Sequence, residues 1–187
     1  MKLHVVILPV KSEHRERTPQ RVEDQRSAAR QALAESARLS GAPLDGYESN
    51  AMGGPLSNDG WHWSVTHKRH YVAAAVGRAA VGVDVEPIRP RSLAEFAAVA
   101  TEAEWSLFPA RDETAFVMMW TAKEAVTKAL GVGLAGFDRC VLVKAEAWVL
   151  GSGGVNWTVR HVVHDGHVFA AAGIELDVEW HVPDVAA

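Results

Sequence analysis

The chain has 187 residues, of which 48% are hydrophobic and 22% are charged, a composition typical of a folded globular protein and not of a disordered or collagen-like chain. The formal net charge of −4 provides no overall basic field, so we expect no nucleic-acid partner. A single cysteine, Cys140, excludes an internal disulfide and fits a reducing compartment. The apolar run at residues 3–10 is too short to cross a membrane, so we expect a cytoplasmic protein with no membrane partner.

The first half of the chain reads as a strand, a long helix, a loop and three more strands. The apolar run at 3–10 predicts the first strand, and apolar residues at helical spacing predict a helix over 20–39. Glycine and proline are frequent in 40–60, which predicts a loop. The three strands that follow are expected at 61–66, 71–77 and 80–86.

The second half begins with helix signals. Thr101 and Glu104 have the spacing of a capping box, and Asp112 is expected to cap a longer helix that ends near Leu130. The glycines that follow Leu130 favour a left-handed helix end. Strands are expected again from about residue 140 to 180.

Residues 61–86 resemble residues 155–179. Trp63 precedes His67 by four residues and Asp84 by 21, and Trp157 precedes a histidine by four residues and an aspartate by 20. This repeat predicts an α+β fold with two similar α/β halves, residues 1–86 and 87–187, related by a pseudo-two-fold axis. We expect each half to be a small antiparallel sheet with a packed helix, and the active site to lie in the cleft between the halves.

Two carboxylates lie two residues apart in the segment GVDVEP. Asp84 and Glu86 point to the same face of a strand, with Cα atoms roughly 7 Å apart. Their like charges repel, and a divalent cation would relieve that repulsion. The alternative is a polar sheet edge that faces water, and the tripeptide Asp177-Val178-Glu179 shows how easily such a pattern arises.

A second polar pattern lies on the predicted helix at 116–133. Trp120, Glu124 and Lys128 are one turn apart on one face of this helix. Taken alone, the pattern is equally typical of an amphipathic helix with a Glu–Lys pair that contributes about 0.2–0.5 kcal/mol.

Together the two segments are more specific. GVDVEP at 82–87, followed by WTAKEAVTKALG at 120–131, resembles the paired signature of the phosphopantetheinyl transferase superfamily, G-(I/V)-D-(I/V)-E and W-(S/T)-x-K-E-(A/S)-x-x-K-x-x-G. WSVTHK at 63–68 is similar to a third, weaker element of that family. The resemblance covers about 50–180, and the length and repeat are similar to the monomeric surfactin-synthetase-activating class.

The resemblance implies a role for each matching residue. Asp84, Glu86 and Glu124 match the magnesium ligands of the family, and carboxylates suit that ion. Basic residues implied to bind coenzyme A are His67 at a phosphate, Lys128 near the pyrophosphate, Lys123 as a further neighbour and Arg26, followed by Arg30, at the 3′-phosphate.

The implied reaction is a Mg²⁺-dependent transfer of 4′-phosphopantetheine from coenzyme A to a serine of an acyl or peptidyl carrier protein. Glu124, directly or through a metal-bound water, takes the serine proton, and Lys128 assists departure of 3′,5′-ADP. The protein is expected to be a monomer, and its sequence does not identify the carrier or the pathway. One alternative is a non-catalytic carrier-binding subunit with the same fold.

Histidines offer a different metal hypothesis. Imidazole is the commonest transition-metal ligand, so a zinc or nickel site is conceivable in either of two groups. These groups are His62, His67 and His70, and His161, His164 and His167. The competing interpretation is that His164 and His167 flank an Asp-Gly hairpin turn and are exposed to solvent.

Overall fold

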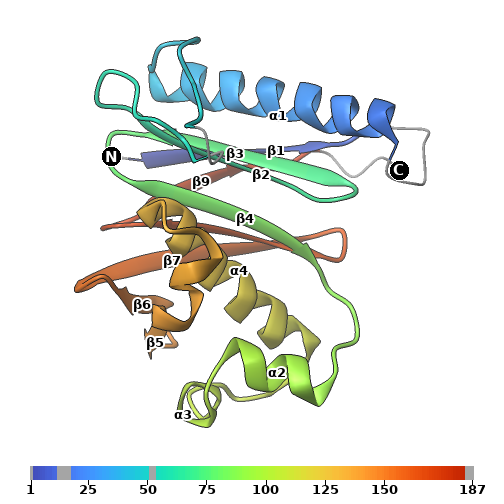
Figure 1. Ribbon diagram of the computed structural model, residues 1–187, viewed down its shortest axis with the longest axis vertical. Coiled ribbons are helices and arrows are strands. Elements are labelled where there is room, and N and C mark those ends of the chain that lie inside the picture. The colour runs from blue at the N-terminus through green and yellow to red at the C-terminus, as the bar shows by residue number, and fades with distance from the viewer. Residues whose placement is uncertain (1, 12–17, 51–53, 184–187) are drawn as a thin grey trace.

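The computed structural model describes residues 2–11, 18–50 and 54–183. These residues form four layers in the order helix, sheet, sheet, helix (Figure 1). The long helix α1 (Pro19–Ser40) covers the outer face of the first sheet, and α4 (Glu113–Leu130) covers the outer face of the second. The predicted α+β class is confirmed. No helix within the described ranges is long and apolar enough to cross a membrane.

The first sheet has the strand order β2-β3-β1-β9. Its strands are β1 (Lys2–Pro9), β2 (His62–His67), β3 (Tyr71–Gly77) and β9 (Asp177–His181). β3 pairs antiparallel with β1 and β2, whereas β9 pairs parallel with β1. The prediction of an antiparallel sheet in each half is therefore wrong for this sheet, because the last strand of the chain crosses over and joins the first strand in the same direction.

The second sheet has the order β4-β8-β7-β6-β5 and is antiparallel throughout. Its strands are β4 (Val81–Pro87), β5 (Val141–Lys144), β6 (Val149–Ser152), β7 (Val155–His164) and β8 (His167–Gly173). β4 thus pairs with β8 and not with its sequence neighbour β3. The predicted boundary after Glu86 follows the sequence repeat but does not separate the two sheets, since β4 and β9 each belong to the sheet formed mainly by the other half.

Shorter helices connect the layers. α2 (Leu93–Val99) and α3 (Glu102–Trp105) lie between β4 and α4, and the 3₁₀ helix η1 (Gly133–Arg139) follows α4. The order strand, helix, hairpin occurs twice, as β1-α1-β2-β3 and as β4-α4-β7-β8. In each case the last strand is hydrogen-bonded between the other two. The hairpins β2-β3 and β7-β8 of the two similar sequence segments therefore correspond, whereas β4 and β9 do not, because β4 pairs antiparallel with β8 and β9 pairs parallel with β1.

Small side chains at the centre of each sheet allow both neighbouring layers to pack closely. β3 and β8 are buried along their whole length and carry runs of alanine. One face of each strand contacts its helix and the other face contributes to the core between the sheets. The larger side chains of this central core include Ile7, Val83, Val85 and Phe169.

Capping residues fix the two ends of α4 and the start of α3. Asp112 accepts a hydrogen bond from the backbone N–H of Ala115, and Gly131 ends α4 in a left-handed conformation, both as predicted. Thr101 and Glu104 form the predicted capping box, although the helix that they begin has only four residues.

Candidate active site

A glycine sets the distance between β4 and α4. A Cβ atom added to Gly82 would lie 1.8 Å from the backbone oxygen of Ala125 and 2.7 Å from the backbone nitrogen of Ala129. Only a residue without a side chain therefore lets the helix approach the strand so closely. This contact brings Lys128, near the end of α4, next to Asp84 on β4.

Asp84 and Lys128 form the centre of a small polar network. The Lys128 ammonium donates hydrogen bonds to Asp84 Oδ1 at 2.6 Å, to Thr66 Oγ1 at 3.2 Å and to the Val83 carbonyl at 3.1 Å. Thr66 in turn donates to Asp84 Oδ1 at 3.1 Å. Asp84 is buried, and its second oxygen, Oδ2, has no hydrogen-bond partner among the described residues. A buried carboxylate oxygen without a partner is costly unless a ligand satisfies it.

The other two predicted carboxylates lie near this network. Glu86 pairs with Lys68 at 2.6 Å, and Glu124 is partly buried on α4. Burial and the negative charges of Asp84 and Glu86 raise the pKa of Glu124, while Lys128 and Lys68 oppose the rise. Burial, together with the neighbouring carboxylates, therefore disfavours the ionised form of Glu124, and a cation bound nearby would offset this effect.

The donor set fits magnesium, although the oxygens are not gathered around one point. Three carboxylates without sulfur or imidazole are typical of Mg²⁺. Within the described ranges, however, the oxygens of Asp84, Glu86 and Glu124 do not all lie within 4.8 Å of one another. Lys128 and Lys68 instead neutralise two of them. The orphaned Asp84 Oδ2 and the raised pKa of Glu124 are the observations that favour a cation here.

A cavity of about 950 Å³ adjoins this network and lies between α1, the loop that follows it, β2 and the end of α4. Three residues predicted to bind coenzyme A, namely Arg26, His67 and Lys128, all line it, as does Arg30. Tyr47 and Trp63 supply aromatic surface, with their rings 6.0 Å apart in an edge-on arrangement. The cavity thus combines positive charge with apolar walls, a combination suited to a phosphorylated ligand with a flat ring.

Lys123 lies elsewhere. Its ammonium is buried and pairs with Glu104 at 2.9 Å, and it is not among the described residues that line the cavity. Burial alone would raise the pKa of Glu104, but hydrogen bonds from the Leu142 and Thr101 backbone and the Lys123 charge lower it. The structure therefore places Lys123 in a buried ion pair between α3 and α4 and not beside a phosphate. The sequence predicted Glu104 only as part of a capping box, and it contained no signal for the ion pair of Glu104 with Lys123.

Sequence reasoning gave no chemical role to the polar residues of β2 before His67. Ser64 accepts a hydrogen bond from the Val83 backbone N–H at 3.0 Å, which joins β2 to β4 across the two sheets. Thr66 orients Asp84 in the network described above. Both belong to the segment WSVTHK, so the alternating pattern of that strand was the available signal.

The histidine hypothesis from sequence is not supported. Among the described residues, none of the six histidines that it named belongs to a group of three metal-ligating atoms close together. The turn at Asp165-Gly166 has positive φ angles at both residues, as an Asp-Gly hairpin requires. The expected exposure of its flanking histidines is wrong for His167, which is buried and hydrogen-bonded to the Asp165 carbonyl.

His161 is a structural residue with a testable pH dependence. Its Nε2 lies 3.1 Å from the Met118 carbonyl of α4, and burial lowers its pKa to about 4. The unfolded state, with a pKa near 6.5, then binds a proton more readily, so stability is complete above about pH 6.5 and is lost as the pH falls toward 4. By pH 5 this single group should cost about 2 kcal/mol of unfolding free energy.

Urea unfolding of the protein and of His161→Phe at pH 7, 6 and 5 measures this contribution. The free energy of unfolding of the wild-type protein should fall relative to that of His161→Phe as the pH falls, because unfolding lets His161 take up a proton and phenylalanine cannot be protonated. Parallel stability curves for the two proteins would contradict the assignment.

Comparison with known proteins gives two kinds of similarity. Residues 80–171 match the sequence model of the 4′-phosphopantetheinyl transferase superfamily. The chain is 36% identical over 70 residues to the L-aminoadipate-semialdehyde dehydrogenase-phosphopantetheinyl transferase of Schizosaccharomyces pombe (strain 972 / ATCC 24843), which covers 34% of this chain and 27% of that protein. It is 32% identical over 94 residues to the 4′-phosphopantetheinyl transferase psf-1 of Bacillus pumilus, which covers 47% of this chain and 40% of that protein. The chain thus spans less than half the length of each of these relatives.

Proposed function

We propose that this chain, which belongs to the 4′-phosphopantetheinyl transferase superfamily through residues 80–171, transfers the 4′-phosphopantetheine group of coenzyme A to a serine of an acyl or peptidyl carrier protein. The names of both relatives support a transferase over the alternative of a non-catalytic carrier-binding subunit. Coenzyme A and the carrier protein are the two substrates, and we propose that the enzyme acts as a monomer.

One observation carries the proposal. Lys128 contacts the buried carboxylate of Asp84 and also lines the cavity that Arg26 and His67 line. A ligand in that cavity would meet Arg26, His67 and Lys128, with the carboxylate of Asp84 beside Lys128. A pyrophosphate linked to a second phosphate, as in coenzyme A, complements basic residues grouped in this way.

The group of carboxylates near this cavity suits a magnesium ion. Asp84, Glu86 and Glu124 are the residues that would hold Mg²⁺, with Asp84 Oδ2 ready to accept it. When bound, the ion neutralises charge that develops on the transferred phosphate and the leaving group. Lys128 and Lys68 would then be free to turn from their carboxylate partners toward the phosphates.

Different residues would bind coenzyme A, accept the serine proton and stabilise the leaving group. Arg26, Arg30 and His67 hold the phosphates of coenzyme A, and Lys128 lies beside the pyrophosphate. The serine oxygen attacks the β-phosphorus, a new O–P bond forms, and the bond to the bridging oxygen breaks to release 3′,5′-ADP. Glu124 would take the serine proton as the general base. Lys128 stabilises the negative charge of the leaving group.

The repeated order of elements supports a pseudo-two-fold relation between the halves. The pieces β1-α1-β2-β3 and β4-α4-β7-β8 would be the related units, and β9, which follows the second unit, joins the sheet of the first. In this arrangement the cavity is formed by α1 and β2 of one unit and the end of α4 of the other. The substrate site would therefore lie between the halves.

The direct test is transfer itself. Incubation of the protein with coenzyme A, Mg²⁺ and a panel of apo-carrier proteins should add one phosphopantetheine mass to at least one carrier, as measured by intact-mass spectrometry. A chelator should stop the reaction, and added Mg²⁺ should restore it. Absence of transfer to every carrier by a protein with a cooperative unfolding transition would favour the binding-subunit alternative.

Arg26 should contribute to binding and not to chemistry. Its guanidinium is largely exposed at the cavity and only loosely paired with Glu23, at 4.0 Å, so it is available for a phosphate. Arg26→Ala should raise the KM for coenzyme A about tenfold, with kcat little changed, because one charge-assisted contact is lost. Arg38→Ala on the same helix is the matched control, since Arg38 pairs with Glu35 and does not line the cavity. An equal change in both variants would contradict this placement.

A further inference from the structure

A second group of potential metal ligands lies on the first sheet, where the two ends of the described chain meet. β9 is the edge strand of this sheet and pairs parallel with β1. His4 on β1 is the register partner of Glu179 on β9, and His181 follows two residues later on the same face of the strand. The pairing of the first and last strands therefore brings together three side chains that are distant in sequence.

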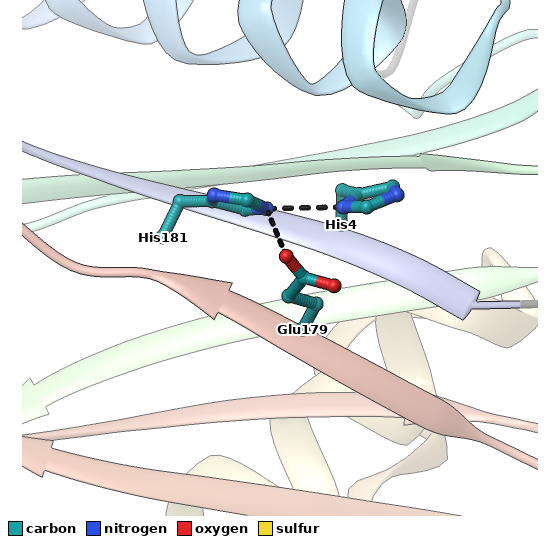
Figure 2. Close-up of side chains that lie close together, drawn as sticks. All are labelled: His4, Glu179 and His181. Carbon is teal, nitrogen blue, oxygen red and sulfur yellow. Dashed lines mark hydrogen bonds and ion pairs between the residues drawn. The ribbon is translucent and has the colours of Figure 1, made fainter.

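The ligand atoms of these side chains face one another, as Figure 2 shows. His4 Nδ1 lies 3.0 Å from His181 Nε2, and His181 Nε2 lies 3.9 Å from Glu179 Oε1. All three atoms lie within 4.8 Å of one another, and each side chain is half-buried. Within the described ranges this is the only group of three such ligands that meets this distance.

We propose that His4, Glu179 and His181 form a binding site for a divalent transition-metal ion, with Zn²⁺ as the best fit. Two imidazoles and one carboxylate are a common zinc donor set, and a water completes a tetrahedral shell. Two nitrogens bound to one tetrahedral zinc lie about 3.3 Å apart, so the observed spacing of the imidazoles needs only a small adjustment. The nitrogen ligands distinguish this site from the carboxylates of the proposed magnesium site.

Neighbouring groups prepare the carboxylate for this role. Lys2 donates to the other oxygen of Glu179, Oε2, at 3.1 Å, and this interaction lowers the pKa of Glu179. The interaction with Lys2 leaves Oε1 directed toward the histidines. Hydrogen-bonded partners of this kind orient the ligands of metal sites.

The expected effect of the ion is structural. His4 and His181 are separated by 177 positions, so a metal that joins them closes nearly the whole chain into one loop. Cross-links that close long loops remove the most entropy from the unfolded state. The ion would hold the edge strand β9 against β1. This role is independent of the proposed transfer reaction, whose residues lie on α1, β2, β4 and α4.

Titration of the untagged, metal-free protein with Co²⁺ tests the site. Tetrahedral Co²⁺ with nitrogen ligands absorbs strongly in the visible range, whereas Co²⁺ bound by carboxylates and water in an octahedral shell absorbs weakly. We expect a visible band that saturates at one Co²⁺ per chain and disappears when Zn²⁺ is added. Zn²⁺ at a hundredfold excess over its Kd should raise the Tm by roughly 5–10 °C.

Variants assign the band to its ligands. His4→Ala and His181→Asn should abolish both the band and the Zn²⁺-dependent Tm shift, and Glu179→Gln should weaken them. His164→Asn, in the hairpin between β7 and β8, and Asp84→Asn, in the carboxylate group, are the matched controls and should keep both signals. Because the metal-dependent shift is measured within each variant, a lower starting Tm does not affect the result, and circular dichroism confirms that each variant is folded.

Three results would overturn the proposal. The first is a wild-type protein without a visible Co²⁺ band. The second is a band that His4→Ala and His181→Asn leave unchanged. The third is a band that Asp84→Asn removes, because the ion would then be bound by the carboxylates and not by the histidines.

Discussion

Asp84→Asn should reduce phosphopantetheine transfer at least about a thousandfold, whereas Asp177→Asn should leave it within a few-fold. The two aspartates begin the same tripeptide in the repeated halves, but their surroundings differ. Asp84 is buried and bonded to Lys128, and its second oxygen is available to a cation. Asp177 is exposed on the edge strand β9, where its register partner is Lys2.

Measurement of kcat for both variants at saturating Mg²⁺ and coenzyme A checks this expectation. The substitution keeps the shape of the side chain and removes its charge, so a loss of turnover reports chemistry and not a cavity. Unfolding transitions recorded alongside control for the unpaired charge of Lys128 in Asp84→Asn. Equal loss of turnover in two fully folded variants would mean that the active site does not belong to β4 alone.

Gly82→Ala should destabilise the protein by about 3 kcal/mol or more and lower its Tm by roughly 6–12 °C. The added methyl group would overlap backbone atoms of α4, which cannot move aside as a flexible side chain can. The helix would have to shift away from β4 and would take Lys128 with it. Transfer activity should therefore fall together with stability.

Gly77→Ala is the matched control for this prediction. Gly77 ends β3 without a positive φ, and a Cβ atom there would meet the end of the Leu3 side chain at 3.2 Å. Leu3 can move by a few tenths of an ångström, so the cost should stay below about 1 kcal/mol. Thermal and urea unfolding of both variants would show the difference. A Gly82→Ala protein as stable as Gly77→Ala would disprove the close approach of α4.

Ion pairs with lysines reduce the repulsion among the three carboxylates of the proposed site. Asp84, Glu86 and Glu124 would repel one another strongly if all three were charged and unpaired. Lys128 and Lys68 neutralise two of them, and the pKa of the third is raised. Lys128 also lines the cavity proposed for coenzyme A, so binding of metal and coenzyme A would exchange its ion pair with Asp84 for a contact with phosphate.

Local sequence signals were sufficient for most of the secondary structure. The strands at 71–77 and the helix from Asp112 to Leu130 agree closely with β3 and α4, because alternation, capping residues and terminal glycines act within a few residues. The short helix α2 was missed, although Ser92 and Glu95 form a capping box there. Its seven residues are too few for a clear helical period.

Residue spacing also predicted which charged side chains share one face of a strand or of a helix. The spacing within GVDVEP and WTAKEAVTKALG placed carboxylates and a lysine on defined faces of a strand and a helix. Arg26, His67 and Lys128 do line one cavity, as their predicted shared ligand requires. Side-chain periodicity is a local property of the backbone, which is why these faces could be predicted.

How those faces meet depends on the tertiary fold. It paired Lys123 with Glu104 in the interior, linked Thr66 to Asp84, and moved β4 and β9 into opposite sheets. It also brought His4 next to His181 from the two ends of the chain. Such contacts depend on strand pairing and on helix distance, which Gly82 sets through the space that its missing side chain leaves. No local pattern specifies them, because they join residues separated by tens to hundreds of positions.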